Sequence, residues 1–291
     1  MSAQPVPDPG AAAGTARRRD LLEEVVETFA ACEDPRLREL LLGVVRHLHA
    51  FASDVRLTVN EWRAGIDFLT EVGHTTTETR HELILLSDTL GLSTLAEMLG
   101  AEGSPEATES TILGPFYVPG SPHRRLGDSI LEDADDGPRA TVRGRVTDLA
   151  GRPLPGALLD IWQNASNRLY AVQDPGQTAT NLRGRFTAAD DGAFEFRTVR
   201  PVPYPIPYDG PVGRMLSATG RHPWRPAHIH FMVSAPGHRT LVTHVFDSRS
   251  EYLDSDAVFG VRDSLIVEFV PAAGDGFVTT FDIALEPVGA S

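Results

Sequence analysis

The amino-terminal third of the chain has the residue spacing of amphipathic helices. Three pairs of a hydroxyl and a carboxylate also have the spacing with which such groups cap helix starts, namely Thr58 with Glu61, Thr79 with Glu82 and Thr94 with Glu97. We therefore expect short helices over residues 20–102, after a flexible tail over residues 1–19 whose first part is mostly Ala, Gly and Pro. Apolar side chains recur at steps of three and four in two runs, which are Leu21, Val25 and Phe29, and Leu37, Leu40, Leu41, Val44, Val45 and Leu48.

From about residue 139 the hydrophobic period changes from that of helices to that of strands. Thr141, Arg143 and Arg145 alternate with apolar or small residues, which is typical of a half-buried strand. Turn signals such as Asp190-Asp191-Gly192 separate several of the runs. The pattern predicts an α+β protein with a mainly antiparallel β-sandwich over residues 103–291, in which 103–138 is an irregular connector. The further runs are Leu158–Trp162, Gly184–Ala188, Ala193–Val199, Ala227–Ser234, Thr240–Phe246, Asp263–Phe269 and Gly276–Leu285.

Composition excludes several classes of protein. The 291 residues are 41% hydrophobic and 23% charged, which is ordinary for a globular protein. No apolar run approaches the roughly 18–20 residues that a membrane span needs. A net charge of −14, without a basic stripe, disfavours nucleic acid as a partner. The single cysteine, Cys32, cannot form an intrachain disulfide, so we expect a reduced cytoplasmic protein.

Two histidines in one predicted strand are the sharpest chemical signal. In the run Arg225 to Phe231, His228 and His230 project from one face, and Ile229 projects from the other. Such a pair suits two neighbouring ligands of one metal ion, because the apolar side fixes the strand. Two exposed or hydrogen-bonded histidines are the alternative.

A proline-rich segment is the second signal. Residues 201–211 hold five prolines that stiffen the backbone around Tyr204 and Tyr208. The segment is either a rigid crossover with surface tyrosines or a loop that holds an oxygen ligand. The motifs of zinc proteases, serine hydrolases, P-loop proteins and dinucleotide-binding proteins are all missing from the sequence.

Several stretches resemble the intradiol ring-cleaving dioxygenases, most closely the hydroxyquinol 1,2-dioxygenase branch. They occur in the family's order, and the similarity spans roughly residues 20–285. One departure is Arg168, where the family often has glycine two residues before its first tyrosine. The stretches are 154–170 (LPGALLDIWQNASNRLY), 181–186 (NLRGRF), 204–207 (YPIP), 209–213 (DGPVG), 225–231 (RPAHIHF), 85–91 (LLSDTLG) and 113–116 (LGPF).

The resemblance implies a mononuclear Fe(III) centre held by Tyr170, Tyr204, His228 and His230. In the family, the tyrosine matching Tyr204 leaves the metal and helps to take the substrate's protons, and the one matching Tyr170 stays. Arg225 matches an arginine that stabilises negative charge on the ring, while a salt bridge to an acidic neighbour is its alternative role. Hard phenolate oxygens favour ferric over ferrous iron, in agreement with this set.

The resemblance also implies a substrate pocket and a substrate, an aromatic diol or triol that is cleaved with O2. Asp88 is a carboxylate that could accept a hydrogen bond from the third hydroxyl of hydroxyquinol, or else an N-cap or surface acid near Gly91. Hydroxyquinol would give 3-hydroxy-cis,cis-muconate, the tautomer of maleylacetate, in the degradation of aromatic compounds; catechol or a substituted catechol is the alternative. The implied walls are Leu85, Asp88, Ile112, Leu113, Gly114, Pro115, Phe116, Ile206 and Val258.

Two further expectations concern the whole molecule. The helical segment resembles the family's dimerisation domain, so we expect a homodimer, and some relatives hold a lipid between these helices. The glycine- and proline-rich string from Gly144 to Gly156 also resembles non-catalytic sandwich modules, which would bind a partner or space domains. Such a module would not need two histidines, an arginine and two tyrosines in this arrangement.

Overall fold

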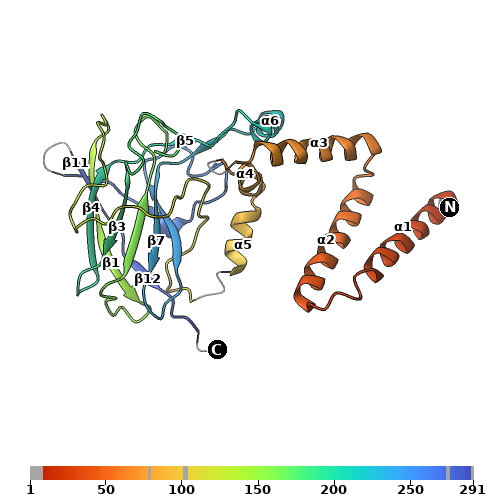
Figure 1. Cartoon of the computed structure of the whole chain (residues 1–291), viewed down its shortest axis with the longest axis horizontal. Coiled ribbons are helices and arrows are strands. Elements are labelled where there is room, and N and C mark those ends of the chain that lie inside the picture. Colours follow the sequence, from red (N-terminus) through yellow and green to blue (C-terminus); the bar gives the residue numbers. More distant parts are fainter. Residues whose placement is uncertain (1–8, 78–79, 101–103, 273–275, 290–291) are drawn as a thin grey trace, which may run out of the picture. The chain divides into compact units, whose positions relative to one another are not determined.

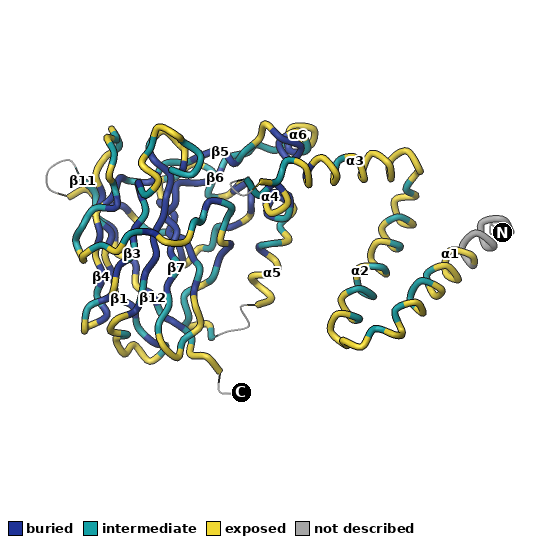
Figure 2. The backbone as a smooth tube through the Cα atoms, in the orientation of Figure 1, coloured by how far each residue is buried: buried dark blue, intermediate teal, exposed yellow. Residues whose placement is uncertain are grey.

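The computed structural model describes residues 9–77, 80–100, 104–272 and 276–289, with side chains from residue 17 onward. The chain forms two compact units, Met1–Phe68 and Leu69–Ser291. The expected boundary near residue 102 therefore differs from the boundary that compactness gives, since two of the helices expected in the first domain belong to the second unit. Figures 1 and 2 show the elements and their burial.

The first unit is helical. Its helices are α1 (Pro9–Glu27), α2 (Pro35–Asp54) and the first part of α3 (Val59–Thr75). Asp34 caps α2 by accepting from the amides of Arg36 and Leu37, and Pro35 takes the first helical position. Thr58 and Glu61 form the expected capping box, because each side chain accepts from the other's backbone amide. Residues 9–19, expected as part of a tail, are helical in α1; residues 1–8 lie outside the described part.

Besides the end of α3, the described part of the second unit contains the α-helices α4 (Glu82–Thr89), α5 (Leu92–Gly100) and α6 (Pro211–Ala218). Gly91 turns the chain between α4 and α5 with a φ of 74°. No single helix in the described residues is long and apolar enough to span a membrane; α4 and α5 meet the criteria of length and composition only together, as a pair bent by 77°.

The other two expected capping pairs have different outcomes. Thr79 lies outside the described residues, so its pairing with Glu82 stays a prediction; the Glu82 carboxylate binds Arg80 and the amide of Val212. Thr94 lies inside α5 rather than at its start, and its hydroxyl donates to the carbonyl of Val258 at 3.0 Å. The pair Thr94–Glu97 was wrong because a carbonyl distant in sequence takes the Thr94 hydroxyl.

Two five-stranded sheets form the body of the second unit (Figure 1). In the first, β1 (Arg139–Asp148) pairs antiparallel with β4 (Ala193–Val199) and parallel with β11 (Gly276–Thr280) and β12 (Ile283–Leu285), while β10 (Val270–Ala272) pairs with β11. The second has the order β3 (Arg183–Thr187), β2 (Leu158–Trp162), β7 (His228–Ser234), β8 (Leu241–Asp247), β9 (Ile266–Val267). A small ribbon joins β5 (Tyr204–Pro205) to β6 (Trp224–Arg225).

Apolar side chains between the two sheets form the core. The Phe231 ring of β7 lies 6.2 Å from Phe194 and 6.1 Å from Phe196, both on β4 of the other sheet. Gly144 in β1 has to be glycine, because a Cβ there would lie 1.8 Å from the Phe281 carbonyl oxygen. At that point the partner of β1 changes from β11 to β12, so the expected run Gly276–Leu285 is two strands.

The sandwich confirms the expected α+β fold, with sheets that are mixed rather than purely antiparallel. The expected strand Asp263–Phe269 is only partly correct, because residues 263–265 form a 3-10 turn, η1, before the two residues of β9. Leu265 and Phe269 are buried because they anchor a loop to the core. Their apolar character is therefore not evidence of a strand.

Candidate metal centre

His228 and His230 stand side by side on the face of β7 that points away from the core. Both are buried, with 0% and 1% of their surface exposed, while Ile229 and Phe231 between and after them belong to the apolar core. Their Nε2 atoms are 3.2 Å apart. The alternative of exposed histidines is therefore excluded.

Tyr170 reaches the same point from the turn that follows β2. Its hydroxyl lies 3.0 Å from Nε2 of His230. Arg168 in this turn has a φ of 72°, the left-handed conformation that glycine adopts most easily. The departure from the family's glycine thus leaves the turn in a glycine-like conformation, and the Arg168 guanidinium lies 4.9 Å from the centre of the Trp224 ring.

Tyr204 comes from the proline-rich segment, where it lies in β5 directly opposite Arg225 in β6. Its ring centre is 5.3 Å from that of Tyr170 and 5.4 Å from that of His228. Tyr204 is 1% exposed, whereas Tyr208 is 59% exposed. The rigid segment therefore buries one tyrosine at the histidines and leaves the other at the surface.

The donor atoms at this point fit a metal ion. Nδ1 of His228 donates to the carbonyl of Pro226 at 2.7 Å, so Nε2 of His228 presents a lone pair toward Nε2 of His230. Two imidazole nitrogens and the Tyr170 oxygen thus converge, and lone pairs so close repel one another unless a cation or a shared proton lies among them. Two nitrogens and two phenol oxygens are a donor set for a transition metal.

Burial governs the protonation of these groups. Burial and then the charge of Arg225 lower the pKa of His228 well below its usual value, so His228 is neutral, as a ligand must be. Burial and then repulsion from Tyr204 raise the pKa of Tyr170 well above its usual value. The Tyr170 phenol therefore ionises at neutral pH only beside a strong Lewis acid.

Arg225 is a buried cation next to the centre. Its Nη1 lies 3.3 Å from Nε2 of His228, and its Nε and Nη2 bind the carboxylate of Asp256. Burial lowers the pKa of Arg225, but the attraction of Asp256 and the two tyrosines outweighs burial and raises it. The salt bridge considered as the alternative role of Arg225 is thus present, and the same guanidinium lies beside the histidines.

The expected wall residues lie unequally close to the centre. The Phe116 ring stacks on Tyr170 with 4.7 Å between ring centres, and a Cβ on Gly114 would lie 3.4 Å from Cε1 of His230. Leu113 is 38% exposed and Pro115 is half-buried, whereas Phe116 is buried. The remaining expected walls are all at most 4% exposed, and they are Leu85, Asp88, Ile112, Ile206 and Val258.

Asp88 is neither an N-cap nor a surface acid. It lies inside α4, is 2% exposed, and its Oδ1 has no hydrogen-bond partner among the described residues. Burial raises the pKa of Asp88, although Ser93 and the charge of Arg225 act against it. A buried acceptor without a partner in the chain can accept from a bound water or from a ligand.

Three residues at the centre were not found by reasoning from the sequence. His244 lies opposite His230 in the β7–β8 pair, with 4.1 Å between ring centres, and its Nδ1 contacts the hydroxyl of Thr111. Trp162 stacks on His230 at 4.6 Å, and Asp256 holds Arg225. Only the pairing of Thr240–Phe246 with the histidine strand could have indicated His244; no spacing in the sequence points to Asp256.

Comparison with known proteins agrees with this geometry. The family profile described as Dioxygenase matches residues 112–287, and the profile described as Catechol dioxygenase N terminus matches residues 34–108. Hydroxyquinol 1,2-dioxygenase from Nocardioides simplex is 49% identical over 90% of this chain and 88% of its own. The 6-chlorohydroxyquinol 1,2-dioxygenase of Cupriavidus pinatubonensis is 47% identical over 93% and 98%.

A solved structure has the same fold over nearly the whole chain. Hydroxyquinol 1,2-dioxygenase from Pseudomonas putida DLL-E4 is 45% identical and superposes with a TM-score of 0.88, covering 94% of this chain and 100% of its own. The alternative of a non-catalytic sandwich module is set aside, because the profiles and relatives are those of enzymes. The chain is an enzyme that belongs to the intradiol ring-cleavage dioxygenase family.

Proposed function

We propose that this protein cleaves hydroxyquinol between its two adjacent hydroxyl groups with O2, using a ferric ion held by Tyr170, Tyr204, His228 and His230. The observation that carries the proposal is the buried convergence of two phenols and two imidazoles beside one fixed cation, Arg225. The ferric ion, when bound, would supply Lewis acidity toward the two adjacent oxygens of the substrate and toward O2.

The chain's own residues bind and orient the substrate and handle its protons. Tyr204 is the strand partner of Arg225, and we propose that its phenolate oxygen takes a proton from the incoming diol. Arg225 stays charged throughout, so its Nη1 stabilises the negative charge that develops on the ring. Phe116 and the other walls keep water from the reacting carbon atoms.

Asp88 supports hydroxyquinol rather than catechol as the preferred substrate. Its partnerless Oδ1 accepts a hydrogen bond from a third hydroxyl group, and catechol would leave this acceptor unpaired at a cost of about 1–3 kcal/mol. The names of the relatives from Nocardioides simplex and Pseudomonas putida agree with this preference. Catechol or a substituted catechol is the second candidate, since a relative from Candida albicans that is 42% identical is named a catechol 1,2-dioxygenase. The name of the Cupriavidus relative points to a chlorinated ring that keeps the third hydroxyl group.

One set of measurements tests the proposal. Purified protein is analysed for iron, for a visible phenolate-to-iron absorption band, and for kcat/KM with hydroxyquinol and with catechol. We expect one iron per chain, a red colour, and a preference for hydroxyquinol that falls at least 10-fold in Asp88→Ala. Colourless protein that folds and yet lacks iron refutes the metal site, whereas a preference of the wild type for catechol refutes only the substrate.

The same proposal extends to the assembly and location of the protein. We propose a homodimer through the amino-terminal helices, since α2 has no buried residue of its own among those described. Mass spectrometry of an organic extract tests whether a lipid lies between the helices. The single cysteine supports a reduced, cytoplasmic location, which cell fractionation tests. We also propose that the functions divide along the chain into a tail (1–19), a helical dimerisation domain (20–102) and a catalytic domain (103–291).

A further inference from the structure

The carboxylate of Asp256 makes more contacts than a salt bridge needs. Oδ1 accepts from Nε of Arg225 at 3.1 Å and from the amide of Val258 at 3.3 Å. Oδ2 accepts from Nη2 of Arg225 at 3.2 Å and from the amide of Gly260 at 3.0 Å. Asp256 therefore ties the guanidinium to the backbone of its own loop, and it is 5% exposed.

The two hydrogen bonds from Arg225 to Asp256 determine which nitrogen of Arg225 faces the centre. Binding through Nε and Nη2 uses one edge of the planar guanidinium and leaves Nη1, at 3.3 Å from Nε2 of His228, as the nitrogen beside the ligands. An arginine held at one nitrogen alone could rotate about its long side chain. Held along one edge, it has one orientation.

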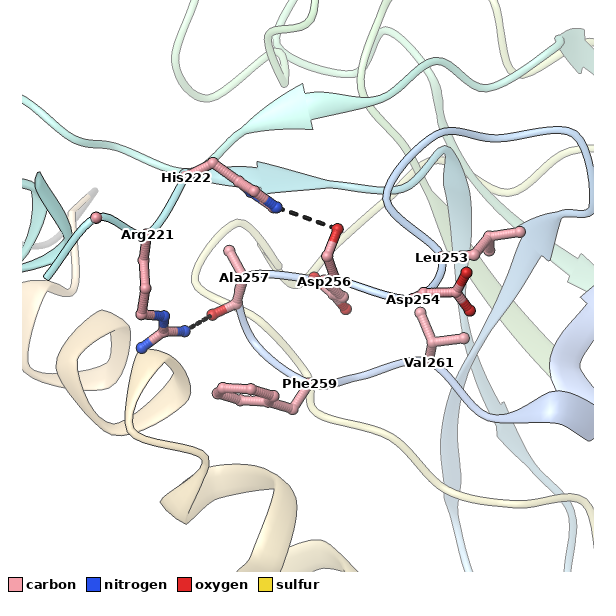
Figure 3. Close-up of a pocket in the computed structure, with 10 residues that line it drawn as sticks. Arg221, His222, Leu253, Asp254, Asp256, Ala257, Phe259 and Val261 are labelled. Atoms are coloured by element: carbon pink, nitrogen blue, oxygen red, sulfur yellow. Dashed lines mark hydrogen bonds between the residues drawn. The ribbon is translucent and has the colours of Figure 1, made fainter.

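The loop that carries Asp256 is held from its inner side. Its outer side borders a surface pocket of about 530 Å³, lined by residues 220–222, 253–257, 259 and 261 (Figure 3). Tyr252 and Phe259 have positive φ values of 69° and 58°, which are strained for side chains of this size. Packing contributes to holding the loop in this conformation, since the Tyr252 ring stacks on Trp224 and the Arg221 guanidinium lies 5.0 Å from the centre of the Phe259 ring.

Polar contacts from elsewhere in the unit also fix the loop. Arg221 donates to the carbonyls of Ala257, at 2.9 Å, and Thr89 (the former contact is drawn in Figure 3), and Thr94 donates to the carbonyl of Val258. These bonds join the loop to the α4–α5 pair. The loop thus has a fixed position relative to α4, so Asp256 can hold Arg225 in one place.

Gly260 shows how closely the guanidinium fits. A Cβ on this residue would lie 2.9 Å from Nη2 of Arg225 and 3.2 Å from Oδ2 of Asp256. Its φ is outside the left-handed region, so alanine is allowed there by the backbone. Gly260→Ala would therefore press most closely on Nη2 of Arg225, and less closely on Oδ2 of Asp256, without removing the carboxylate.

We propose that Asp256 is a positioning residue, which holds the Arg225 guanidinium along one edge so that Nη1 faces the metal ligands and the reacting ring. This inference rests on the proposed role of Arg225. Asp256 does not touch the reacting atoms, so its removal slows the reaction through Arg225 and leaves metal and substrate binding nearly unchanged.

The test is a double-mutant cycle with separate readings of folding, metal and binding. The variants are Asp256→Asn, Arg225→Lys, both together, and Asp254→Asn as the control. Asp254 is an exposed carboxylate in the same loop that lines the pocket. Each holoenzyme is measured for thermal midpoint, iron content, kcat and KM with hydroxyquinol, and the Kd of 4-nitrocatechol under nitrogen.

We expect Asp256→Asn to lower kcat by about 10- to 100-fold, with the 4-nitrocatechol Kd and the iron content changed less than 3-fold. In the Arg225→Lys background the same substitution should lower kcat less than 3-fold, because the group that it positions is already altered. Asp254→Asn should match the wild type. Equal losses in both backgrounds, or an unchanged kcat in Asp256→Asn, overturn the inference.

Two further variants keep the test decisive if Asp256→Asn does not fold. Asp256→Glu keeps the charge but moves it by one methylene, and Gly260→Ala displaces Nη2 with the carboxylate intact. Both should lower kcat at least 5-fold without loss of iron; wild-type kcat in both overturns the inference. If Arg225→Lys itself keeps the wild-type kcat, the proposed role of Arg225 has failed, which is a different result from the failure of Asp256.

Discussion

At the scale of single residues, the centre combines groups that each pay for burial with a specific partner. His228 is held by a backbone carbonyl, Arg225 by Asp256, and Tyr170 by a hydrogen bond to His230. Asp88 differs, since one of its oxygens has no partner among the described residues. This residue therefore gives a direct prediction about stability.

Asp88 should make the folded protein less stable as its carboxyl group ionises. Its pKa is raised by burial, so the folded protein holds this proton more tightly than the unfolded chain does. The stability that it contributes is then present below the ordinary carboxyl pKa of about 3.9 and lost as the pH rises through the raised pKa. Relative to the wild type, Asp88→Asn should gain free energy of unfolding across that window and keep the gain above it.

Urea unfolding of the metal-free proteins at a series of pH values measures this difference. Asp254→Asn, at an exposed carboxylate of the same unit, serves as the control for the loss of one negative charge. A gain for Asp88→Asn that is constant with pH, or that shrinks as the pH rises, would contradict a raised pKa at Asp88.

Arg168 is the second residue with a specific prediction. Its left-handed backbone costs about 1–2 kcal/mol for a residue other than glycine, and its stacking on Trp224 returns about 0.5–1 kcal/mol. Arg168→Gly should thus change the free energy of unfolding by less than about 1 kcal/mol, because glycine also gives the unfolded chain more freedom. Arg168→Val should cost about 2 kcal/mol, since a β-branched side chain avoids this conformation.

Chemical denaturation of the two variants, with iron content as a second reading, checks the turn that presents Tyr170. Equal stability of the Gly and Val variants would show that the φ of residue 168 does not constrain this turn. Loss of iron in Arg168→Gly would show that the arginine contributes to the centre beyond its backbone.

At the scale of elements, the hydrophobic period predicted the strands that lie in the sandwich. It failed where buried apolar side chains belong to a turn or loop. The alternation in β1 and the short runs of β2 and β4 were correct because each has one face in a common core. The run 263–269 was only partly correct, because residues 263–265 form a 3-10 turn and only residues 266–267 form a strand. The hydrophobic period shows which side chains are buried. A strand and an irregular loop can give the same period, so it does not distinguish the two.

The centre was predictable to the extent that its residues are close in sequence. The histidine pair follows from the alternation of one strand. Tyr170 came from the resemblance alone. The proline-rich segment indicated a possible oxygen ligand near Tyr204, but only the resemblance selected this tyrosine, since the turn and the ribbon that bring the two tyrosines to His230 and Arg225 are tertiary features. Asp256 lies 31 residues beyond Arg225 in a loop, and no local rule connects the two.

The β7–β8 strand pair adds a prediction about His244. This residue is opposite His230, and its ring packs against the His230 ring with 4.1 Å between ring centres. Removing a group that supports a metal-binding histidine commonly costs 10- to 100-fold in affinity. His244→Leu should therefore lose iron about 10-fold faster to a chelator, with a shifted visible band. Thr243→Val, at the adjacent buried position of β8, is the control, and equal loss from both variants would indicate general loosening of the strand.

At the scale of the whole molecule, the two units differ in how they bury apolar surface. The sheets of the second unit enclose a continuous core, whereas α2 and the start of α3 carry exposed apolar side chains (Figure 2). Leu40, Val44 and Leu48 follow one another at steps of four on α2 and are 51%, 55% and 60% exposed. An apolar stripe of this kind indicates a partner surface, which we propose is a second copy of the chain.

Leu48→Glu should weaken that dimer at least 10-fold, because a carboxylate placed in an apolar interface loses its hydration without gaining a partner. Ala50→Glu is the matched control, since residue 50 is exposed on a different side of the same helix. Sedimentation equilibrium over a range of concentrations measures both. Each predicted metal site draws its ligands from residues 170–230 of one chain, so a folded Leu48→Glu monomer should keep most of its kcat. A wild type that sediments as a monomer, or a Leu48→Glu variant with the dimerisation constant of Ala50→Glu, would exclude this face as the interface.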